Sequence, residues 1–137
     1  MKLKKGFTMQ GRDKELLIKN WLLKSDEAMD DAKIAVGNNR LSTTQNRLYY
    51  AIFYAISALA QKYGFATSKH GQLLGWFNRE FIKTNKVEEK YGKLYIKTFD
   101  NRQRSDYTIT FQPDKQALIS DIHDTEEFIK VIKQLAE

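Results

Sequence analysis

The side chains best suited to chemistry in this sequence lie between residues 100 and 107. Arg102 and Asp106 are four positions apart, so on a helix their side chains can form an ion pair. Arg102 also shares a helical face with Tyr95 and Phe99, which turns it partly inward, and an inward arginine needs a carboxylate or an anionic ligand. Two interpretations therefore stay open: an ion pair that closes one end of a helical fold, or an arginine that holds a phosphate.

A second group of polar side chains follows one face of a predicted central helix over residues 43–63. This row, which we name the polar seam, consists of Arg47, Tyr50, Tyr54, Ser57 and Gln61. Two apolar rows cover well over half of the same helix, so other elements must pack on more than one side of it. The polar seam is then either a hydrogen-bonded line in the core or a site. If residues 100–107 cross its first turns, Arg47 and Tyr50 converge with Arg102 and Tyr107.

The two histidines narrow the possible chemistry. His70 begins a predicted helix, where it can offer a proton or help to hold an anion near the helix dipole; a half-buried core histidine is the alternative. His123 is the second, and the chain has no cysteine. The sequence also lacks a His-Glu-x-x-His motif, a glycine-rich phosphate loop and the paired Glu-x-x-His motifs of di-iron bundles. We therefore expect no metal site and no cofactor.

Composition and charge point to a basic globular protein. The 137 residues carry a net charge of +6, with 23 basic and 17 acidic side chains. Residues 69–104 hold nine of the basic and four of the acidic side chains, so this part can meet an anion such as RNA or a nucleotide, although a solvated lysine-rich surface remains the alternative. No apolar run approaches the about 20 residues that span a bilayer, and no signal peptide is recognisable. We expect a cytoplasmic protein that does not enter a membrane.

The elements that must position these side chains are helices. We predict a basic N-terminal leader over residues 1–11 and a single helical domain over residues 12–137. Within it, helical spacing predicts helices over 12–36, 43–63, 69–83, from 87 past 99, and 114–135. Residues 107–111 alternate between apolar and polar side chains but have no partner strand, so we predict an extended loop. The expected fold is an all-α, up-and-down bundle of four to five helices.

Three segments together resemble one known family, the HEPN domains (higher eukaryotes and prokaryotes nucleotide-binding), and in particular its small stand-alone prokaryotic members. Residues 47–53 are similar to the family's arginine-x-tyrosine-tyrosine-alanine-x-phenylalanine helix. Residues 70–84 are similar to its histidine-led third helix, and residues 102–107 to its arginine-x-x-x-aspartate-tyrosine ending. The order and the spacing of these segments, between about residues 40 and 107, carry the resemblance.

The resemblance implies a helical bundle that often forms a homodimer. Many HEPN proteins are metal-independent ribonucleases, frequently toxins of toxin–antitoxin pairs, and others accompany a minimal nucleotidyltransferase. The nucleolytic members carry an arginine followed four to six residues later by a histidine. Here Asp106, Tyr107 and Thr108 stand at those distances from Arg102, and no histidine follows Arg104 either. His70 lies on another predicted helix.

Three functional hypotheses follow. The one we favour is a non-catalytic module that binds a nucleotide or RNA and works with a minimal nucleotidyltransferase. Its predicted phosphate- or nucleotide-binding residues are Arg47, Tyr50, Arg102, Arg104, Asp106 and Tyr107. The second is a metal-independent ribonuclease with a degenerate motif, whose candidate catalytic residues are Arg102, His70 and Tyr107. The third is a structural dimerisation protein with the polar seam in its interface.

Overall fold

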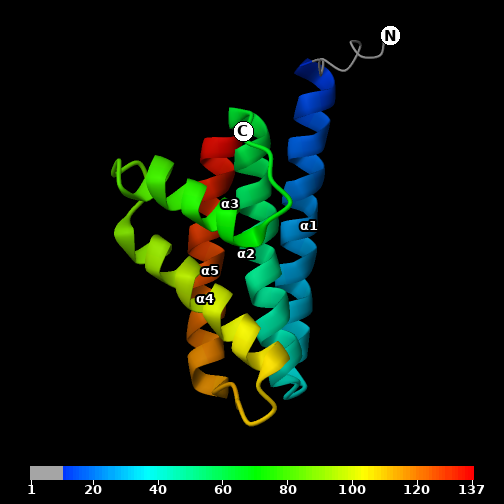
Figure 1. Cartoon of the computed structure of the whole chain (residues 1–137). Helices are drawn as coiled ribbons and strands as arrows, with labels where there is room; N and C mark the ends of the chain where they lie inside the picture. Colours follow the sequence, from blue (N-terminus) through cyan, green and yellow to red (C-terminus); the bar gives the residue numbers. More distant parts are fainter. Residues whose placement is uncertain (1–10) are drawn as a thin grey trace.

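A computed structural model describes residues 11–137, which fold into a bundle of helices without a strand among them (Figure 1). The elements are α1 (Gly11–Gly37), α2 (Leu41–Tyr63), α3 (His70–Phe77), the short π-helical segment η2 (Asn78–Ile82), α4 (Glu89–Tyr107) and α5 (Lys115–Ala136). The predicted all-α bundle is confirmed. The predicted leader lies outside the described residues except for Gly11, which begins α1. No helix in the described part of the chain is long and apolar enough to cross a membrane.

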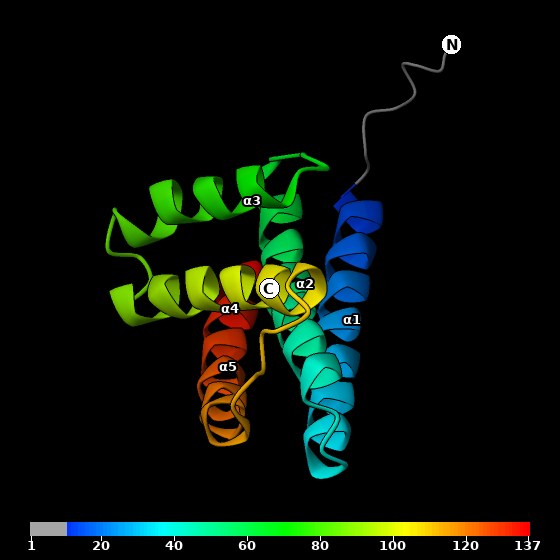
Figure 2. The ribbon, with the colours of Figure 1, turned by 60° about the horizontal axis from the view of Figure 1, so that its bottom comes forward.

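The helices form two groups of different direction. α1, α2 and α5 run along the long axis of the molecule, whereas α3 and α4 lie across α2, as the turned view shows (Figure 2). α2 contacts α1, α3, α4 and α5. Its apolar rows explain this central place, because Leu48, Ile52, Ile56 and Leu59 are all fully buried and each faces a neighbouring helix rather than water. The expectation of partners on more than one side of this helix is confirmed.

Small side chains bring α1 close to α2. Ala28, Ala32 and Ala35 of α1 are buried, so the two backbones approach without large side chains between them. Ser25 of α1 is also fully buried, and its hydroxyl donates a hydrogen bond to the backbone carbonyl of Ala51 over 2.7 Å. A buried hydroxyl with a partner costs little, so this contact fixes the register of α1 against the first half of α2.

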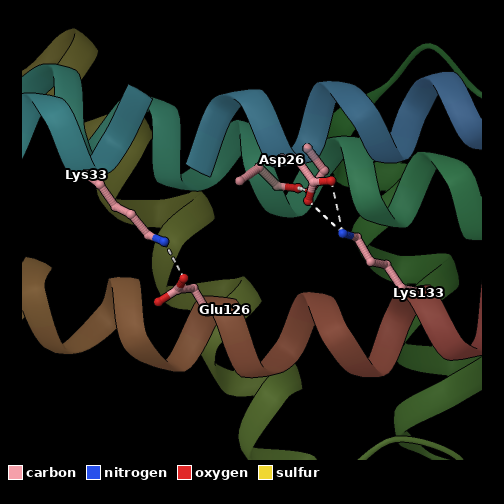
Figure 3. A network of polar contacts seen from close by, with 6 residues as sticks. Asp26, Lys33, Glu126 and Lys133 are labelled. Atoms are coloured by element: carbon pink, nitrogen blue, oxygen red, sulfur yellow. Dashed lines mark hydrogen bonds and ion pairs between the residues drawn. The ribbon is translucent and has the colours of Figure 1, made fainter. Parts of the chain in front are cut away.

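Ion pairs connect the outer surfaces of α1 and α5 (Figure 3). Asp26 accepts two hydrogen bonds from the ammonium group of Lys133, at 2.7 and 3.0 Å, and Lys33 pairs with Glu126. The hydrogen bond that Lys33 donates to the Glu126 carboxylate raises the pKa of Lys33. These side chains are all partly exposed, so each pair contributes about 1 kcal/mol at most. The apolar core between the helices is therefore the main source of stability.

α4 continues past the point where its helix propensity weakens. Helix propensity weakens after Asn101, yet α4 runs to Tyr107. The reason is tertiary, because the Arg102 side chain is only 12% exposed and packs on rings of α2, which holds the last turns in helical form. Tyr107 consequently ends a helix instead of starting an extended segment. A loop without strands follows to Asp114, whose carboxylate caps α5 by accepting a hydrogen bond from the backbone amide of Ala117 at 3.0 Å.

Candidate functional site

A group of aromatic and charged side chains gathers where α3 and α4 cross the first half of α2. We name it the Arg102 cluster. It consists of Arg47, Tyr49, Tyr50, Phe53, His70, Phe99, Arg102 and Asp106. α2 supplies the first four, α3 supplies His70, and α4 supplies the last three. The cluster therefore depends on how three helices cross.

Tyr49 links the three helices. Its ring is fully buried, and its hydroxyl lies 2.8 Å from Nδ1 of His70, within hydrogen-bonding distance. The ring of Phe99 meets it edge-on with 5.8 Å between centroids. Burial raises the pKa of Tyr49, and the positive charge of Arg102 opposes that rise only in part. The hydroxyl thus stays protonated at neutral pH and is available as a hydrogen-bonding group.

His70 opens α3 and is half-buried against α2. Its ring stacks on Phe53 with 4.2 Å between centroids and an interplanar angle of 22°. Burial lowers the pKa of His70, and the nearby positive charge of Arg102 lowers it further. The imidazole is therefore neutral at pH 7. A neutral imidazole can accept a proton or a hydrogen bond, which a charged one cannot.

Arg102 forms the predicted pair with Asp106, but that pair does not use all of its donors. Nη1 of Arg102 lies 3.4 Å from Oδ2 of Asp106, a long contact. The guanidinium carbon lies 4.7 Å from the ring centroid of Tyr49 and 5.7 Å from that of Tyr50, which are cation–π distances. Nε is buried and has no hydrogen-bond partner among the described residues. A guanidinium has five N–H donors, so donors remain for a ligand.

Arg47 approaches the same ring from α2. Its guanidinium carbon lies 5.2 Å from the centroid of Tyr50, and Nε and Nη2 donate to the Oδ1 atom of Asn46 at 3.0 and 2.9 Å. Within residues 11–137, Arg47 forms no salt bridge, and Asp106 is the one carboxylate paired with Arg102. Two guanidinium groups therefore surround the Tyr50 ring with one paired carboxylate, and this surplus of positive charge favours an anion.

Two predicted site residues lie away from this cluster. Arg104 is exposed and lines a separate groove on α4 with Lys93 and Lys97, because two residues along a helix turn a side chain to nearly the opposite face. Tyr107 is 80% exposed at the end of α4. The predicted convergence of four residues is thus met by Arg47, Tyr50 and Arg102, and not by Tyr107.

Tyr49 and Phe53 were not among the predicted site residues, because both belong to an apolar row of the central helix. A hydroxyl at Tyr49 within that row is the signal that points to a polar partner. Residues of the polar seam further toward the C-terminal end of α2 have structural contacts instead. Tyr54 stacks on Trp21 at 5.9 Å, and the hydroxyl of Ser57 donates to the backbone carbonyl of Phe53 at 2.8 Å.

The described part of the chain has no group of three or more histidine, aspartate or glutamate side chains arranged to hold a metal ion. His123, the histidine outside the Arg102 cluster, lines a groove between α4 and α5 with Lys90, Asp124 and Glu127.

A family model and several known proteins match this chain over most of its length. The model of the HEPN domain family matches residues 18–135. A Thermotoga maritima protein named "UPF0332 protein" is 39% identical over 91% of this chain and 95% of its own length. Two Methanocaldococcus jannaschii proteins are each named a "putative toxin". The first is 31% identical over 80% of this chain and 81% of its own length, and the second is 25% identical over 81% of this chain and 76% of its own length.

Proposed function

The chain belongs to the HEPN domain family, and from that premise we propose that the Arg102 cluster binds a phosphate group of RNA or of a nucleotide. The observation that carries this proposal is the surplus of positive charge around Tyr50. The guanidinium carbons of Arg47 and Arg102 lie 5.2 and 5.7 Å from its ring centroid, and Asp106 is the one carboxylate in ion-pair contact with either of them within residues 11–137.

A guanidinium group with paired donors suits a phosphate better than a single point charge would. A guanidinium presents paired donors that match two phosphate oxygens. Arg102 is 12% exposed, so its contact with an anion is screened less by water than a contact at an exposed arginine. Tyr50 is half-buried beside both cations, and its ring offers a face on which a base can stack.

The proposed role is binding without cleavage. At the position where a nucleolytic HEPN protein carries a histidine, Asp106 offers only acceptor atoms when it is ionised. The same proposal includes a homodimer, a minimal nucleotidyltransferase as partner and a cytoplasmic location, all of which rest on the family. Exposed apolar side chains on the outer face of α1, Leu16 at 56% and Leu23 at 55%, support an additional protein contact.

A second candidate function is RNA cleavage, which one observation favours. His70 lies in the same cluster as Arg102, hydrogen-bonded to the Tyr49 hydroxyl at 2.8 Å, although it is distant in sequence. Its lowered pKa keeps the imidazole neutral, which is the form that can take a proton from a 2′-hydroxyl. Arg102 would then stabilise the charge that develops on the phosphate. The toxin-named relatives are compatible with this alternative.

One set of assays separates the two candidates. Purified protein with EDTA is mixed with a labelled single-stranded RNA, and affinity and cleavage are measured for the wild type, Arg102→Ala, His70→Gln and Arg104→Ala. Arg104 is a matched control, since it is an arginine on the same helix but outside the cluster. Binding that Arg102→Ala weakens and Arg104→Ala retains, without cleavage, supports the proposed function. Cleavage that His70→Gln abolishes while the affinity persists supports the second candidate. Equal affinity of all four proteins, with no cleavage by any of them, contradicts both.

A further inference from the structure

A groove beside the Arg102 cluster has no role in the function described so far. It lies between the last turns of α1 and the first turns of α2, has a volume of about 550 Å³, and is lined by side chains that include Asp31, Ile34, Asn38, Arg40, Thr43 and Arg47. We name it the Arg40 groove. Its size falls within the range of small-ligand sites. The question is which ligand its side chains fit.

The charges of the Arg40 groove favour an anion. Arg40 precedes α2 and Arg47 follows seven residues later, so about two helical turns bring both to one side of α2. Neither arginine forms a salt bridge with a carboxylate of residues 11–137. Asp31 is the acidic side chain in the lining, which leaves the groove with two guanidinium groups and one carboxylate.

The rest of the lining fits the neutral parts of a nucleotide. Ile34 is 64% exposed, and it presents an apolar surface on which a base or ribose can pack. The amide nitrogen of Asn38 already donates to the backbone carbonyl of Ile34 at 2.9 Å, so Asn38 adds an amide oxygen and Thr43 a hydroxyl. Both groups can hydrogen-bond to base edges and to the 2′-hydroxyl of RNA. Cationic, apolar and polar groups thus occur together in one groove.

Arg47 connects the Arg40 groove to the Arg102 cluster. It lines the groove, and its guanidinium carbon also lies 5.2 Å from the ring centroid of Tyr50, over which Arg102 lies at 5.7 Å. An anionic ligand can therefore extend from Arg102 past Tyr50 and Arg47 to Arg40 without leaving a cationic surface.

We propose that the Arg40 groove is a second nucleotide subsite, which holds a neighbouring nucleotide of the same single-stranded RNA whose phosphate binds at the Arg102 cluster. Arg40 and Arg47 contact its phosphate, and Ile34 packs against its base or ribose. This inference rests on the proposed function, and it makes the ligand a strand with at least two phosphates rather than a mononucleotide. Two linked contacts raise the affinity for such a strand beyond that of either contact alone.

The test compares ligands of two lengths. Affinities for AMP and for a six-nucleotide single-stranded RNA are measured for the wild type, Arg40→Gln, Arg102→Ala and Arg79→Ala. Arg79 is the matched control because it is exposed on η2, away from both sites, and pairs with Glu80. Arg40→Gln is expected to weaken the affinity for the six-nucleotide RNA by about tenfold. It should also reduce the slope of log affinity against log salt concentration by about the amount that one phosphate contact contributes. Its affinity for AMP should match that of the wild type.

The outcomes separate this inference from the proposed function. If Arg102→Ala weakens the affinity for the RNA while Arg40→Gln has the same affinity as Arg79→Ala, the proposed function stands and the second subsite is wrong. Equal weakening of AMP and RNA by Arg40→Gln also overturns the subsite, because it indicates a general charge effect. If the wild type binds neither ligand, both proposals fail. Arg40 is exposed, and its hydrogen bonds use backbone atoms: its amide donates to the carbonyl of Ala35 at 2.9 Å, and its carbonyl accepts from Thr44. Arg40→Gln should therefore fold normally, which circular dichroism can verify.

Discussion

Replacing Arg102 with alanine should change the free energy of unfolding by less than about 1 kcal/mol and still remove most of the affinity for RNA. The structure supplies terms of both signs for stability. The contact with Asp106 is a partly exposed pair four residues apart, worth about 0.3–0.5 kcal/mol. The two ring contacts, with Tyr49 and Tyr50, add about 0.5–1 kcal/mol each.

The opposing term is the buried Nε atom of Arg102, which has no partner within residues 11–137. A buried donor without a hydrogen bond costs about 1–3 kcal/mol, which offsets the favourable contacts almost completely. A bound phosphate would add acceptors for the guanidinium nitrogens other than the buried Nε. Losing a charge-assisted hydrogen bond to the ligand costs about 1.5–3 kcal/mol, which corresponds to a roughly 10- to 150-fold weaker affinity.

Urea denaturation and fluorescence anisotropy with a labelled single-stranded RNA measure the two quantities on the same samples. Arg104→Ala is the control, since it removes the same charge from the same helix at an exposed position. A loss of more than about 3 kcal/mol in Arg102→Ala together with an unchanged affinity would falsify this reasoning. Such a result would mean that Arg102 serves to close the bundle through Asp106 and does not hold an anion.

Three further measurements test other features of the molecule. Burial and the charge of Arg102 lower the pKa of His70 in the folded protein below 6.5, so the unfolded chain binds a proton at His70 at a higher pH than the folded protein does. The free energy of unfolding should therefore fall as the pH drops through 6.5. Urea denaturation at several pH values should show a smaller fall for His70→Gln than for the wild type. A methyl group at Gly92 would lie 3.0 Å from a side-chain carbon of Ile82, whereas one at Gly75 meets nothing within 4 Å. Gly75→Ala should therefore raise the melting temperature through a helix-propensity gain of about 1 kcal/mol, and Gly92→Ala should not, because overpacking costs about 1–3 kcal/mol. Equal shifts of the melting temperature in the two variants would contradict the close contact. If the outer face of α1 forms a homodimer interface, Leu23→Glu, at a side chain 55% exposed, should convert the dimer to a folded monomer in sedimentation experiments, and an unchanged mass would exclude that face.

Local patterns predicted the helices well because helical periodicity is a property of neighbouring residues. In the helix predicted over residues 114–135, helical spacing aligns Leu118, Ile122, Thr125, Ile129 and Ile132 on one face, and all five are buried in α5. The end of α4 was predicted less well. Its last turns are held by contacts of Arg102 with rings on another helix, and propensity alone does not contain that contribution.

The partial success at the candidate site has the same origin. Helical spacing placed Arg47 and Tyr50 on one face of α2, and Arg102 on the face of α4 that carries Phe99. Whether these faces meet depended on how the two helices cross, and in the structure they do meet. Tyr107, which was expected to converge with them, is exposed instead, because the orientation of a residue at a helix end depends on where the helix stops.

By itself, the sequence determined an all-α chain, the inward faces of its helices and a family resemblance, since all three depend on residue types at short and regular spacing. Only the tertiary structure decided that Tyr49 and His70, 21 positions apart, share a hydrogen bond in the cluster that contains Arg102. That meeting depends on the way α3 and α4 cross α2 (Figure 2). A crossing of this kind is set by side-chain packing over the whole core, which no single stretch of the chain encodes.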